Sequence, residues 1–256
     1  MEEQLVYGNW IRKKILLILG LCSLGTGALI FVPLGWVYRT SMILLFIIVF
    51  ASFLFPLYSY LMFSPRGGKF QEKVYNLILD HLGTALNGKI IDIGTGNGVL
   101  AVKLAQSFPA VEVTGMDYWG KDWEYSIGVC EQNARIAKVA DRVHYEKGDA
   151  ATLVYPPGTF DGAVSNLTFH EVKSVADKRI VVREALRVLK PGSPFVFVDY
   201  FYDETHYGKA TVFAAYFRDL NLAQFECVPL HQKMVMPVLL RHPKILGKAG
   251  IVYGRV

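Results

Sequence analysis

The first quarter of the chain almost lacks charge. Between residues 4 and 71 there is no Asp or Glu, and between residues 15 and 63 the only charged side chain is Arg39. Charged residues make up 19% of all 256 residues, against about 25% in an ordinary soluble domain. The remaining sequence has a normal balance of acidic and basic residues, so the deficit is confined to one segment. A disordered chain and a charged coiled coil are both excluded.

Cysteine is also scarce, and long basic runs are absent. The three cysteines, Cys22, Cys130 and Cys227, are far apart and have no CxxC or Cys/His spacing. We therefore expect reduced thiols in an intracellular domain and no metal site. The net charge of +5 comes without a basic cluster, so the sequence predicts no nucleic-acid partner.

The uncharged segment contains two apolar runs, residues 15–37 and 41–63, which are joined by residues 38–40. Each run has 23 residues, and about 20 suffice for a helix to cross the bilayer core. The sequence predicts a transmembrane helical hairpin in an anchor domain, 1–63, followed by a soluble domain, 64–256. A signal peptide is disfavoured, because its apolar region has only about 7–15 residues and a cleavage site. One span plus one interfacial helix remains an alternative.

Basic residues flank this pair of runs, whereas the connection between them has only Arg39. The flanking residues are Arg12, Lys13, Lys14, Arg66 and Lys69. Because cytoplasmic flanks carry the excess of Lys and Arg, both termini and the soluble domain are expected in the cytoplasm. The predicted location is a two-pass membrane protein, with the lipid bilayer as a partner.

Strand and helix patterns alternate through the soluble domain. The expected strands are residues 89–93, 111–116, 143–146, 161–165, 195–200, 225–230 and 250–255. The expected helices are residues 74–86, 99–108, 125–140, 177–188 and 211–222. This order predicts an α/β fold with a Rossmann-like, mostly parallel seven-stranded sheet, and ligands beyond the carboxyl ends of its strands.

A glycine-rich turn follows the first expected strand, in the stretch Asp92-Ile93-Gly94-Thr95-Gly96-Asn97-Gly98. Glycine lets the backbone turn sharply and lets a ligand approach it closely. The spacing is GxGxG, whereas a dinucleotide-binding turn has GxGxxG. Asp92 would repel a diphosphate and would suit a ligand with an amino group. The turn therefore favours S-adenosylmethionine, which carries an ammonium and a sulfonium, over a nicotinamide dinucleotide.

This turn resembles the first motif of class I S-adenosylmethionine-dependent methyltransferases, and the resemblance covers about residues 70–200. Asp117, at the end of the second strand, matches the acidic residue of that family. The other matching segments are Gly148-Asp149-Ala150, the strand 161–166, and the stretch 184–192 ending in Lys-Pro-Gly.

The resemblance implies a role for each matching position. Asp117 is expected to accept both ribose hydroxyls, Asp92 to hold the amino group directly or through water, and Asp149 to face the adenine amino group. Tyr118 or Trp119 would stack on the adenine, unless the aromatic stretch 118–123 forms a substrate wall or faces the membrane. The implied cofactor-binding residues are Asp92, Gly94, Thr95, Gly96, Asn97, Gly98, Asp117, Tyr118, Asp149, Ala150 and Asn166.

The candidate catalytic residues follow the fourth strand, where the methyl group should emerge. Asn166-Leu167-Thr168-Phe169 is similar to the Asn-Pro-Pro-Tyr/Phe motif of amino-group methylators but lacks both prolines. His170 comes next and would either remove a proton from the acceptor or pack against the following helix. The candidates are thus Asn166 and His170. Further candidates at the rim are Glu171, Asp199, Tyr200, Tyr202, Asp203 and His206.

Together these features predict a membrane-anchored S-adenosylmethionine-dependent methyltransferase whose acceptor is a small, hydrophobic or lipid-like molecule. Two alternatives remain open at this stage. One is a membrane-anchored NAD(P)-dependent oxidoreductase, and the other is a non-catalytic module that binds the cofactor.

Overall fold

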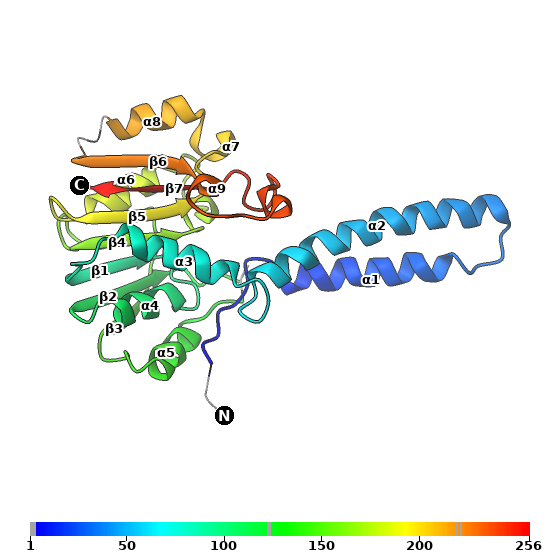
Figure 1. Cartoon of the computed structure of the whole chain (residues 1–256), viewed down its shortest axis with the longest axis horizontal. Helices are drawn as coiled ribbons and strands as arrows, with labels where there is room; N and C mark the ends of the chain where they lie inside the picture. Colours follow the sequence, from blue (N-terminus) through cyan, green and yellow to red (C-terminus); the bar gives the residue numbers. More distant parts are fainter. Residues whose placement is uncertain (1–3, 122–123, 219, 221) are drawn as a thin grey trace. The chain divides into compact units, whose positions relative to one another are not determined.

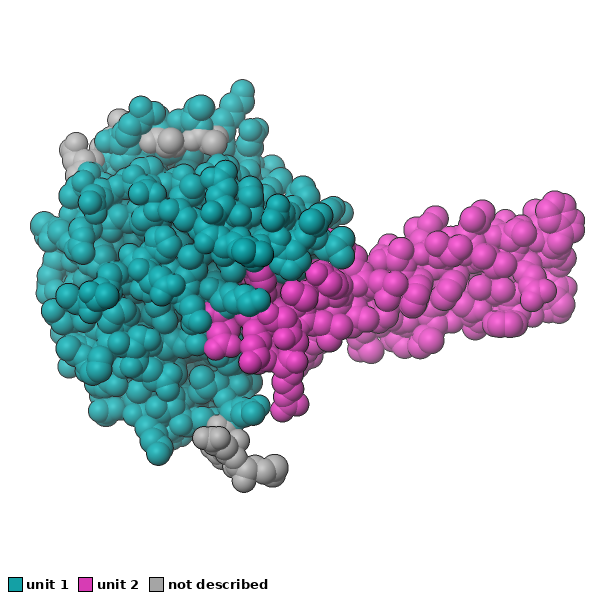
Figure 2. Space-filling model, viewed as in Figure 1, with its two compact units in different colours: residues 1–7, 73–256 teal, residues 8–72 magenta. Residues whose placement is uncertain are grey.

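The computed structural model describes residues 4–121, 124–218, 220 and 222–256. The chain separates into two compact units, coloured in Figure 2. Residues up to 7 and from 73 onward form unit 1, and residues 8–72 form unit 2. The domain boundary expected at residues 63/64 remains a prediction.

Unit 1 is built on one seven-stranded sheet with the order β3-β2-β1-β4-β5-β7-β6 (Figure 1). The strands are β1 Gly88–Ile93, β2 Val111–Asp117, β3 Val143–Lys147, β4 Gly162–Asn166, β5 Pro194–Asp199, β6 Gln224–Pro229 and β7 Gly250–Arg255. All neighbouring pairs are parallel except β5–β7 and β6–β7. The predicted mostly parallel, seven-stranded α/β sheet is therefore confirmed.

The direction of strand order reverses at β1. After β1 the chain crosses to β2 on one side, and β4 later pairs with the other side of β1. In a doubly wound sheet such a reversal opens a crevice at the carboxyl ends of the strands. The glycine turn follows β1 and the Asn166 segment follows β4, so both lie at this crevice.

Short helices accompany the strands: the first begins within unit 2 and precedes β1, and the others lie between strands of unit 1. The helices are α3 Phe70–His81, α4 Val99–Ser107, α5 Ile127–Ile136, α6 Arg179–Arg187, α7 Glu204–Tyr207, α8 Ala210–Arg218 and α9 Leu230–Lys233, with 3₁₀ turns η1 Phe169–Glu171 and η2 Val238–Arg241. The helix expected over 211–222 is shorter than predicted, and its positions 219 and 221 lie outside the described residues.

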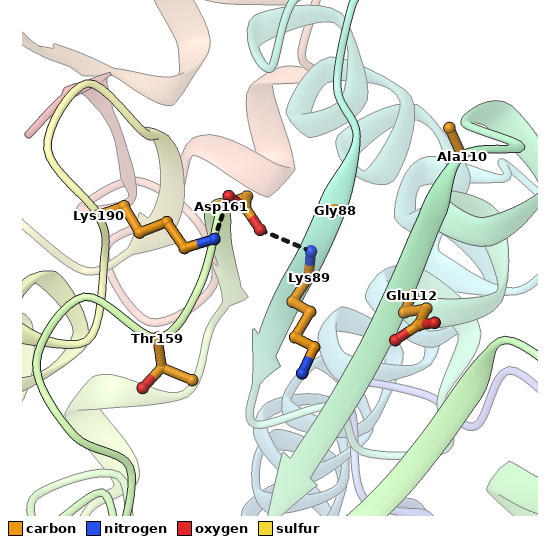
Figure 3. A pocket seen from close by; sticks show the side chains of 7 residues that line it. All are labelled: Gly88, Lys89, Ala110, Glu112, Thr159, Asp161 and Lys190. Atoms are coloured by element: carbon orange, nitrogen blue, oxygen red, sulfur yellow. Dashed lines mark hydrogen bonds and ion pairs between the residues drawn. The ribbon is translucent and has the colours of Figure 1, made fainter.

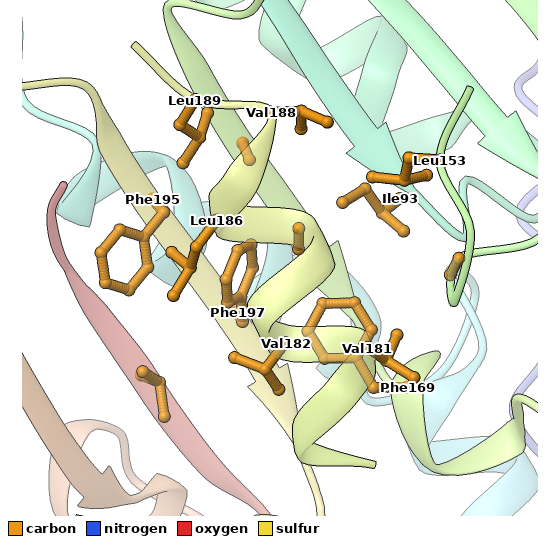
Figure 4. Packing of buried hydrophobic residues seen from close by; sticks show 14 of the residues in the cluster. Ile93, Leu153, Phe169, Val181, Val182, Leu186, Val188, Leu189, Phe195 and Phe197 are labelled. Carbon is orange, nitrogen blue, oxygen red and sulfur yellow. The ribbon is translucent and has the colours of Figure 1, made fainter. Parts of the chain in front are cut away.

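The core shows why α6 and β5 form where they do. Every residue of β5 is buried, because this central strand is covered on both faces. In α6, Val181, Val182 and Leu186 recur at helical spacing on one face. Figure 4 shows these side chains packed with Phe197 of β5 and with Phe169 of the turn after β4. The segment after β4 is thus fixed by core packing as well as by its backbone.

Unit 2 is a pair of antiparallel helices, α1 Lys13–Leu29 and α2 Trp36–Phe63 (Figure 1). Among the described residues, α2 is the one helix whose length and composition would let it cross a bilayer. At 1.5 Å per residue α2 is about 42 Å long, whereas α1 is about 26 Å and falls short of a hydrocarbon core of about 30 Å.

The predicted hairpin of two equal spans is therefore not supported. The expected connection at residues 38–40 is wrong, because these residues lie within α2 and the helices are joined by residues 30–35. Gly35, with φ 91°, directly precedes α2, and Pro33 lies in the same connection. Pro33 has no backbone N–H to donate, so α1 cannot continue through this connection, and Gly35 provides the positive φ from which α2 begins.

Candidate functional site

The glycine turn is held against the end of β2 by its backbone. The N–H groups of Gly94 and Thr95 both donate to the carbonyl of Met116, at 2.7 and 3.1 Å. Gly94, Gly96 and Gly98 have φ of 78°, 60° and 75°, a left-handed conformation that favours glycine. A Cβ on Gly94 would lie 1.9 Å from Oγ1 of Thr168. Glycine is therefore required here both by conformation and by the close approach of the β4 turn.

Asp92 lies at the base of the turn and is buried, with 1% exposure. Its Oδ2 accepts a hydrogen bond from Thr95 Oγ1 at 2.6 Å. Burial raises the pKa of Asp92 to about 7, the neighbouring charge of Asp117 adds to this, and the Thr95 hydrogen bond opposes it. The carboxyl is thus poised between its neutral and charged forms near neutral pH.

Asp117 connects the end of β2 to the same turn. Its Oδ2 accepts from the N–H of Gly96 at 2.8 Å, and its Oδ1 accepts from the N–H of Trp119 at 2.9 Å. The indole N–H of Trp119 in turn donates to the carbonyl of Gly96 at 2.9 Å. Each carboxylate oxygen can accept a second hydrogen bond, so two acceptor positions remain for a pair of hydroxyls. Sequence reasoning did not foresee that Asp117 also shapes the turn.

Asn97, one of the predicted residues, serves the local structure as well. Asn97 accepts from the N–H of Ser126 at 3.4 Å through Oδ1, and its carbonyl accepts from Asn133 Nδ2 at 2.8 Å. Asn97 therefore joins the turn to α5, and its side chain is used in that contact. Asn133, which is fully buried, was not identified from the sequence as part of the site. The available signal was a polar residue on the buried face of an expected helix.

The segment after β3 contains Asp149 and Ala150. Asp149 Oδ1 accepts from the N–H of Ala151 at 2.9 Å, an arrangement that closes a local turn. Gly148 N–H donates to the carbonyl of Asp117 at 3.0 Å, which places this segment beside the end of β2. Tyr118 is 65% exposed, and Lys147 Nζ lies 5.5 Å from its ring centroid. Of the aromatic stretch 118–123, positions 122 and 123 lie outside the described residues.

The turn after β4 completes the crevice. Thr168 Oγ1 lies 3.3 Å from the carbonyl of Gly94 and donates toward it, and Leu167 has φ 53°. Asn166 Oδ1 is buried, and no hydrogen-bond donor reaches it from the part of the chain that the structure describes. An unpartnered buried acceptor is costly unless a ligand satisfies it. Thr168 lies in the stretch 166–169 singled out from the sequence, but nothing in that stretch indicated its contact with Gly94.

His170 and Asp199 form a pair at the carboxyl ends of the strands. His170 lies in the turn after β4, and Asp199 is the last residue of β5. His170 Nδ1 lies 2.8 Å from Oδ1 of Asp199, which is fully buried. The backbone N–H of His170 also points to Asp199 Oδ2, at 3.3 Å. His170 Nε2 lies 3.6 Å from Glu171 Oε1, and the His170 ring meets the Tyr200 ring edge-on at 4.4 Å. The structure thus brings together His170, Glu171, Asp199 and Tyr200, all candidates from the sequence.

This environment raises the pKa of His170. Burial alone would lower it, but the charge of Asp199 and its hydrogen bond outweigh burial, and Glu171 adds to them. Lys178, whose Nζ donates to the carbonyls of Val172 and Val175, opposes the shift. Because Asp199 binds Nδ1, the imidazole orientation is fixed and Nε2 is the nitrogen left for other chemistry.

Of the remaining rim candidates, Tyr202 and Asp203 are directed elsewhere. Tyr202 Oη donates to the carbonyl of Cys227 at 3.3 Å, and Asp203 Oδ2 pairs with Lys248 Nζ at 3.1 Å. His206 is closer to the pair, with its ring centroid 6.0 Å from that of His170.

A cavity of about 390 Å³ lies at the opposite edge of the sheet (Figure 3). Gly88 begins β1, Glu112 is near the start of β2, and Lys190 pairs with Asp161 at 2.6 Å beside them. Ligands of parallel sheets bind beyond the carboxyl ends, and this cavity is at the amino ends. It therefore has no part in the site described above.

Comparison with known families decides the class of the protein. A family model described as "Methyltransferase domain" matches residues 86–233, more than half of the chain. The chain belongs to the methyltransferase domain family. The predicted enzyme class, an S-adenosylmethionine-dependent methyltransferase, and the predicted cofactor are confirmed. The oxidoreductase alternative is set aside.

Curated relatives of this methyltransferase act on different small molecules according to their names. A 27-O-demethylrifamycin SV methyltransferase of Amycolatopsis mediterranei is 35% identical over 112 residues, 44% of this chain and 38% of the relative. A demethylmenaquinone methyltransferase of Deinococcus radiodurans is 29% identical over 112 residues, 44% of this chain and 43% of the relative. The matched regions thus span less than half the length of these relatives.

Solved structures show the same fold. A geranyl diphosphate C-methyltransferase of Streptomyces coelicolor, in complex with geranyl diphosphate and S-adenosylhomocysteine, has a TM-score of 0.55 at 16% identity and covers 73% of this chain and 78% of its own. The [4+2]-cyclase SpnF has a TM-score of 0.52 at 18% identity and covers 72% and 79%. Because a cyclase shares the fold, the reaction of this methyltransferase has to be argued from its site.

The residues of this methyltransferase fit S-adenosylmethionine. The glycine cradle is flanked by two carboxyl groups, Asp92 and Asp117, and Asn166, whose buried Oδ1 has no partner among the described residues, ends the neighbouring strand β4. This set of acceptors matches a ligand with an amino group, a sulfonium and two hydroxyls, and it would repel a diphosphate.

Proposed function

We propose that this protein transfers a methyl group from S-adenosylmethionine to a small, hydrophobic acceptor. The observation that carries the proposal is the pair of carboxyl groups, Asp92 and Asp117, on either side of the glycine turn at the crevice. The names of the relatives, which include a quinone pathway and a terpenoid diphosphate, support an acceptor of this size and polarity.

In this proposal Asp117 receives the ribose hydroxyls, Asp92 the amino group, and the segment at Asp149 and Ala150 the adenine. The bound cofactor supplies an electrophilic methyl group on a sulfonium. The chain's own contribution is to hold the acceptor in line with that methyl group, which can account for much of the acceleration of a displacement. In this proposal Asn166 Oδ1, which has no partner among the described residues, accepts a hydrogen bond from one of the two ligands.

His170 is the proposed general base. Its Nδ1 is held by Asp199, so its Nε2 can take a proton from an acceptor hydroxyl, amine or acidic carbon. Asp199 does not contact the acceptor in this proposal. It positions the imidazole and stabilises the charged ring after proton transfer.

Incubation with radiolabelled S-adenosylmethionine tests the function. Wild-type protein with an extract of membrane lipids is expected to give label in an organic-soluble small molecule. Label found only in protein or RNA, or none in any fraction from a chain that binds S-adenosylhomocysteine, would contradict the proposal.

The pH dependence of cofactor binding is a first specific prediction. Because the free protein raises the pKa of Asp92 to about 7, part of this carboxyl is neutral below pH 7, and a cationic amino group requires the charged form. Affinity for S-adenosylhomocysteine is expected to rise by about tenfold per pH unit up to pH 7 and then level off, as for one linked proton. Calorimetry from pH 5.5 to 8 measures this. An Asp92→Asn variant should bind weakly at every pH, and a flat profile in the wild type would exclude Asp92 from the amino-group site.

We also propose that unit 2 attaches the enzyme to a lipid bilayer through α2. Leu44 and Ile48 near the middle of α2 are 63% and 65% exposed, and large exposed apolar surfaces mark sites of membrane or protein contact. Attachment would keep the enzyme and a membrane-dissolved acceptor on one surface.

A charge in the middle of α2 is expected to release the protein from membranes. Ile47→Lys with Ile48→Lys adds two charges, each costing about 2.5–3.5 kcal/mol at a helix centre. The wild type should stay in the pellet after alkaline carbonate extraction, and the variant should move to the supernatant. Val154→Lys, at an 87% exposed valine of unit 1, is the control and should behave as wild type. Extraction of the wild type itself would refute the attachment.

A further inference from the structure

A surface segment between β6 and β7 combines exposed apolar side chains with basic ones. Val235, Val238 and Leu239 are 92%, 79% and 51% exposed. Arg241 and Lys244 directly follow and are exposed as well. From residue 230 to residue 256 the sequence has five Lys and Arg residues and no Asp or Glu. We call residues 233–244 the apolar–basic loop.

The loop has a defined conformation. Arg241 Nε donates to the carbonyl of Met236 at 3.0 Å, and the N–H groups of Leu240 and Leu246 donate to the carbonyls of Pro237 and Leu240, both at 3.0 Å. Met236 and Leu240 are buried, with 2% and 0% exposure. The buried side chains of Met236 and Leu240 therefore anchor the loop, so the outward position of Val235 and Val238 is fixed by the fold. Holding large apolar side chains in water is unfavourable, and their transfer to an apolar phase is worth about 25 cal/mol per Å².

Strand pairing places this loop at the edge of the sheet that carries the site. Gly250, the first residue of β7, pairs with Asp199 at the end of β5 and with Pro229 at the end of β6. The N–H of Tyr202 donates to the carbonyl of Lys248 at 3.1 Å. The connection between β6 and β7, which contains the loop, therefore ends beside the segment that follows Asp199, the partner of His170.

We infer that the apolar–basic loop docks the catalytic edge of unit 1 on an anionic lipid surface. Val235, Val238 and Leu239 enter the apolar boundary of the bilayer, while Arg241 and Lys244 meet anionic headgroups. Apolar side chains that are flanked by basic residues, with no acidic residue nearby, favour binding to an anionic lipid surface. The inference rests on the proposed function in one respect: it explains how a membrane-dissolved acceptor would reach His170 without crossing water.

An environment-sensitive fluorophore tests the contact on the full chain. Val235→Cys is introduced together with Cys22→Ser, and an NBD group is attached at neutral pH. Burial raises the pKa of the Cys130 thiol and raises that of Cys227 to about 11, so both native thiols react slowly with the label. The labelled protein is placed in nanodiscs of phosphatidylcholine with phosphatidylglycerol, and in discs of phosphatidylcholine alone. Val154→Cys, labelled in the same way, is the matched control at an exposed valine of another loop.

The label at position 235 is expected to shift to shorter wavelengths and to be quenched by lipids carrying a nitroxide in the acyl chain, and the label at position 154 to show neither effect. Lys244→Gln should lower the affinity of the loop for anionic discs about fivefold, because one basic residue near an anionic surface contributes that much.

Equal signals at positions 235 and 154 in anionic discs would overturn the inference. A shift that appears without lipid and grows with protein concentration would overturn it in favour of a second copy of the chain. None of these readouts requires methyl transfer, so a failed acceptor screen beside a quenched label would refute the function alone.

Discussion

Replacing Asp117 with Ala is expected to weaken binding of S-adenosylhomocysteine by roughly 10- to 150-fold, which corresponds to about 1.5–3 kcal/mol for hydrogen bonds to a charged group. The carboxylate holds the N–H groups of Gly96 and Trp119 and has two further acceptor positions for ribose. The variant therefore loses both the ligand contacts and part of the shape of the turn. Calorimetry at one pH above 7.5 measures the loss.

Two controls separate these contributions. Glu112→Ala removes a carboxylate from the start of the same strand, at the opposite edge of the sheet, and should leave binding unchanged. The 2′-deoxy analogue of S-adenosylhomocysteine should bind less tightly than the parent to wild type but equally to Asp117→Ala, because a double-mutant cycle isolates the hydroxyl contact. If both proteins distinguish the two ligands equally well, another residue binds the ribose.

His170→Ala is expected to lower kcat by about 10²- to 10⁴-fold, the usual contribution of a general base, while affinity for S-adenosylhomocysteine stays within about twofold. The reason is that Nε2 of His170 would act on the acceptor and not on the cofactor. Methyl transfer to the membrane extract measures kcat. His144→Gln, at an exposed histidine of β3, should retain full activity.

The pH profile provides the second readout for this residue. His170 must be neutral to accept a proton, and its pKa lies above the ordinary value, so the rate should rise with pH and level off above that pKa. Asp199→Asn removes the charge that raises this pKa. The rise should therefore move to lower pH, with a reduced plateau because the imidazole loses its orienting partner. If His170 only packed against its neighbours, the pH at which the rate rises would be the same in Asp199→Asn as in the wild type.

The glycine turn could be predicted from sequence because its chemistry is local. Positive φ at Gly94, Gly96 and Gly98 and a carboxyl two residues earlier are encoded in one short stretch. The central strands were predictable for a similar reason, since β1, β4 and β5 are short, mostly apolar and largely buried. The alternation of strands and helices then left few possible topologies.

Features that depend on contacts between distant segments were not predictable. The pairing of His170 with Asp199 joins residues 29 positions apart, and only the register of β4 against β5 brings them together. The use of Asn97 to hold α5 depends in the same way on Asn133, 36 positions away. The hairpin was misjudged for a different reason. Hydropathy counts apolar residues but is insensitive to Pro33 and Gly35, which interrupt the helical structure between α1 and α2.

The position of β7 bears on how the enzyme comes into being during translation. β7 is inserted between β5 and β6, so β5 keeps an unpaired edge, and the turn following Asp199 lacks its neighbour at Gly250, until this last strand has been synthesised. The apolar helices of unit 2, in contrast, precede all seven strands in the sequence and are synthesised before them. If α2 attaches the enzyme to a bilayer as proposed, the nascent chain can reach the lipid before β7 completes the part of the sheet next to His170 and Asp199.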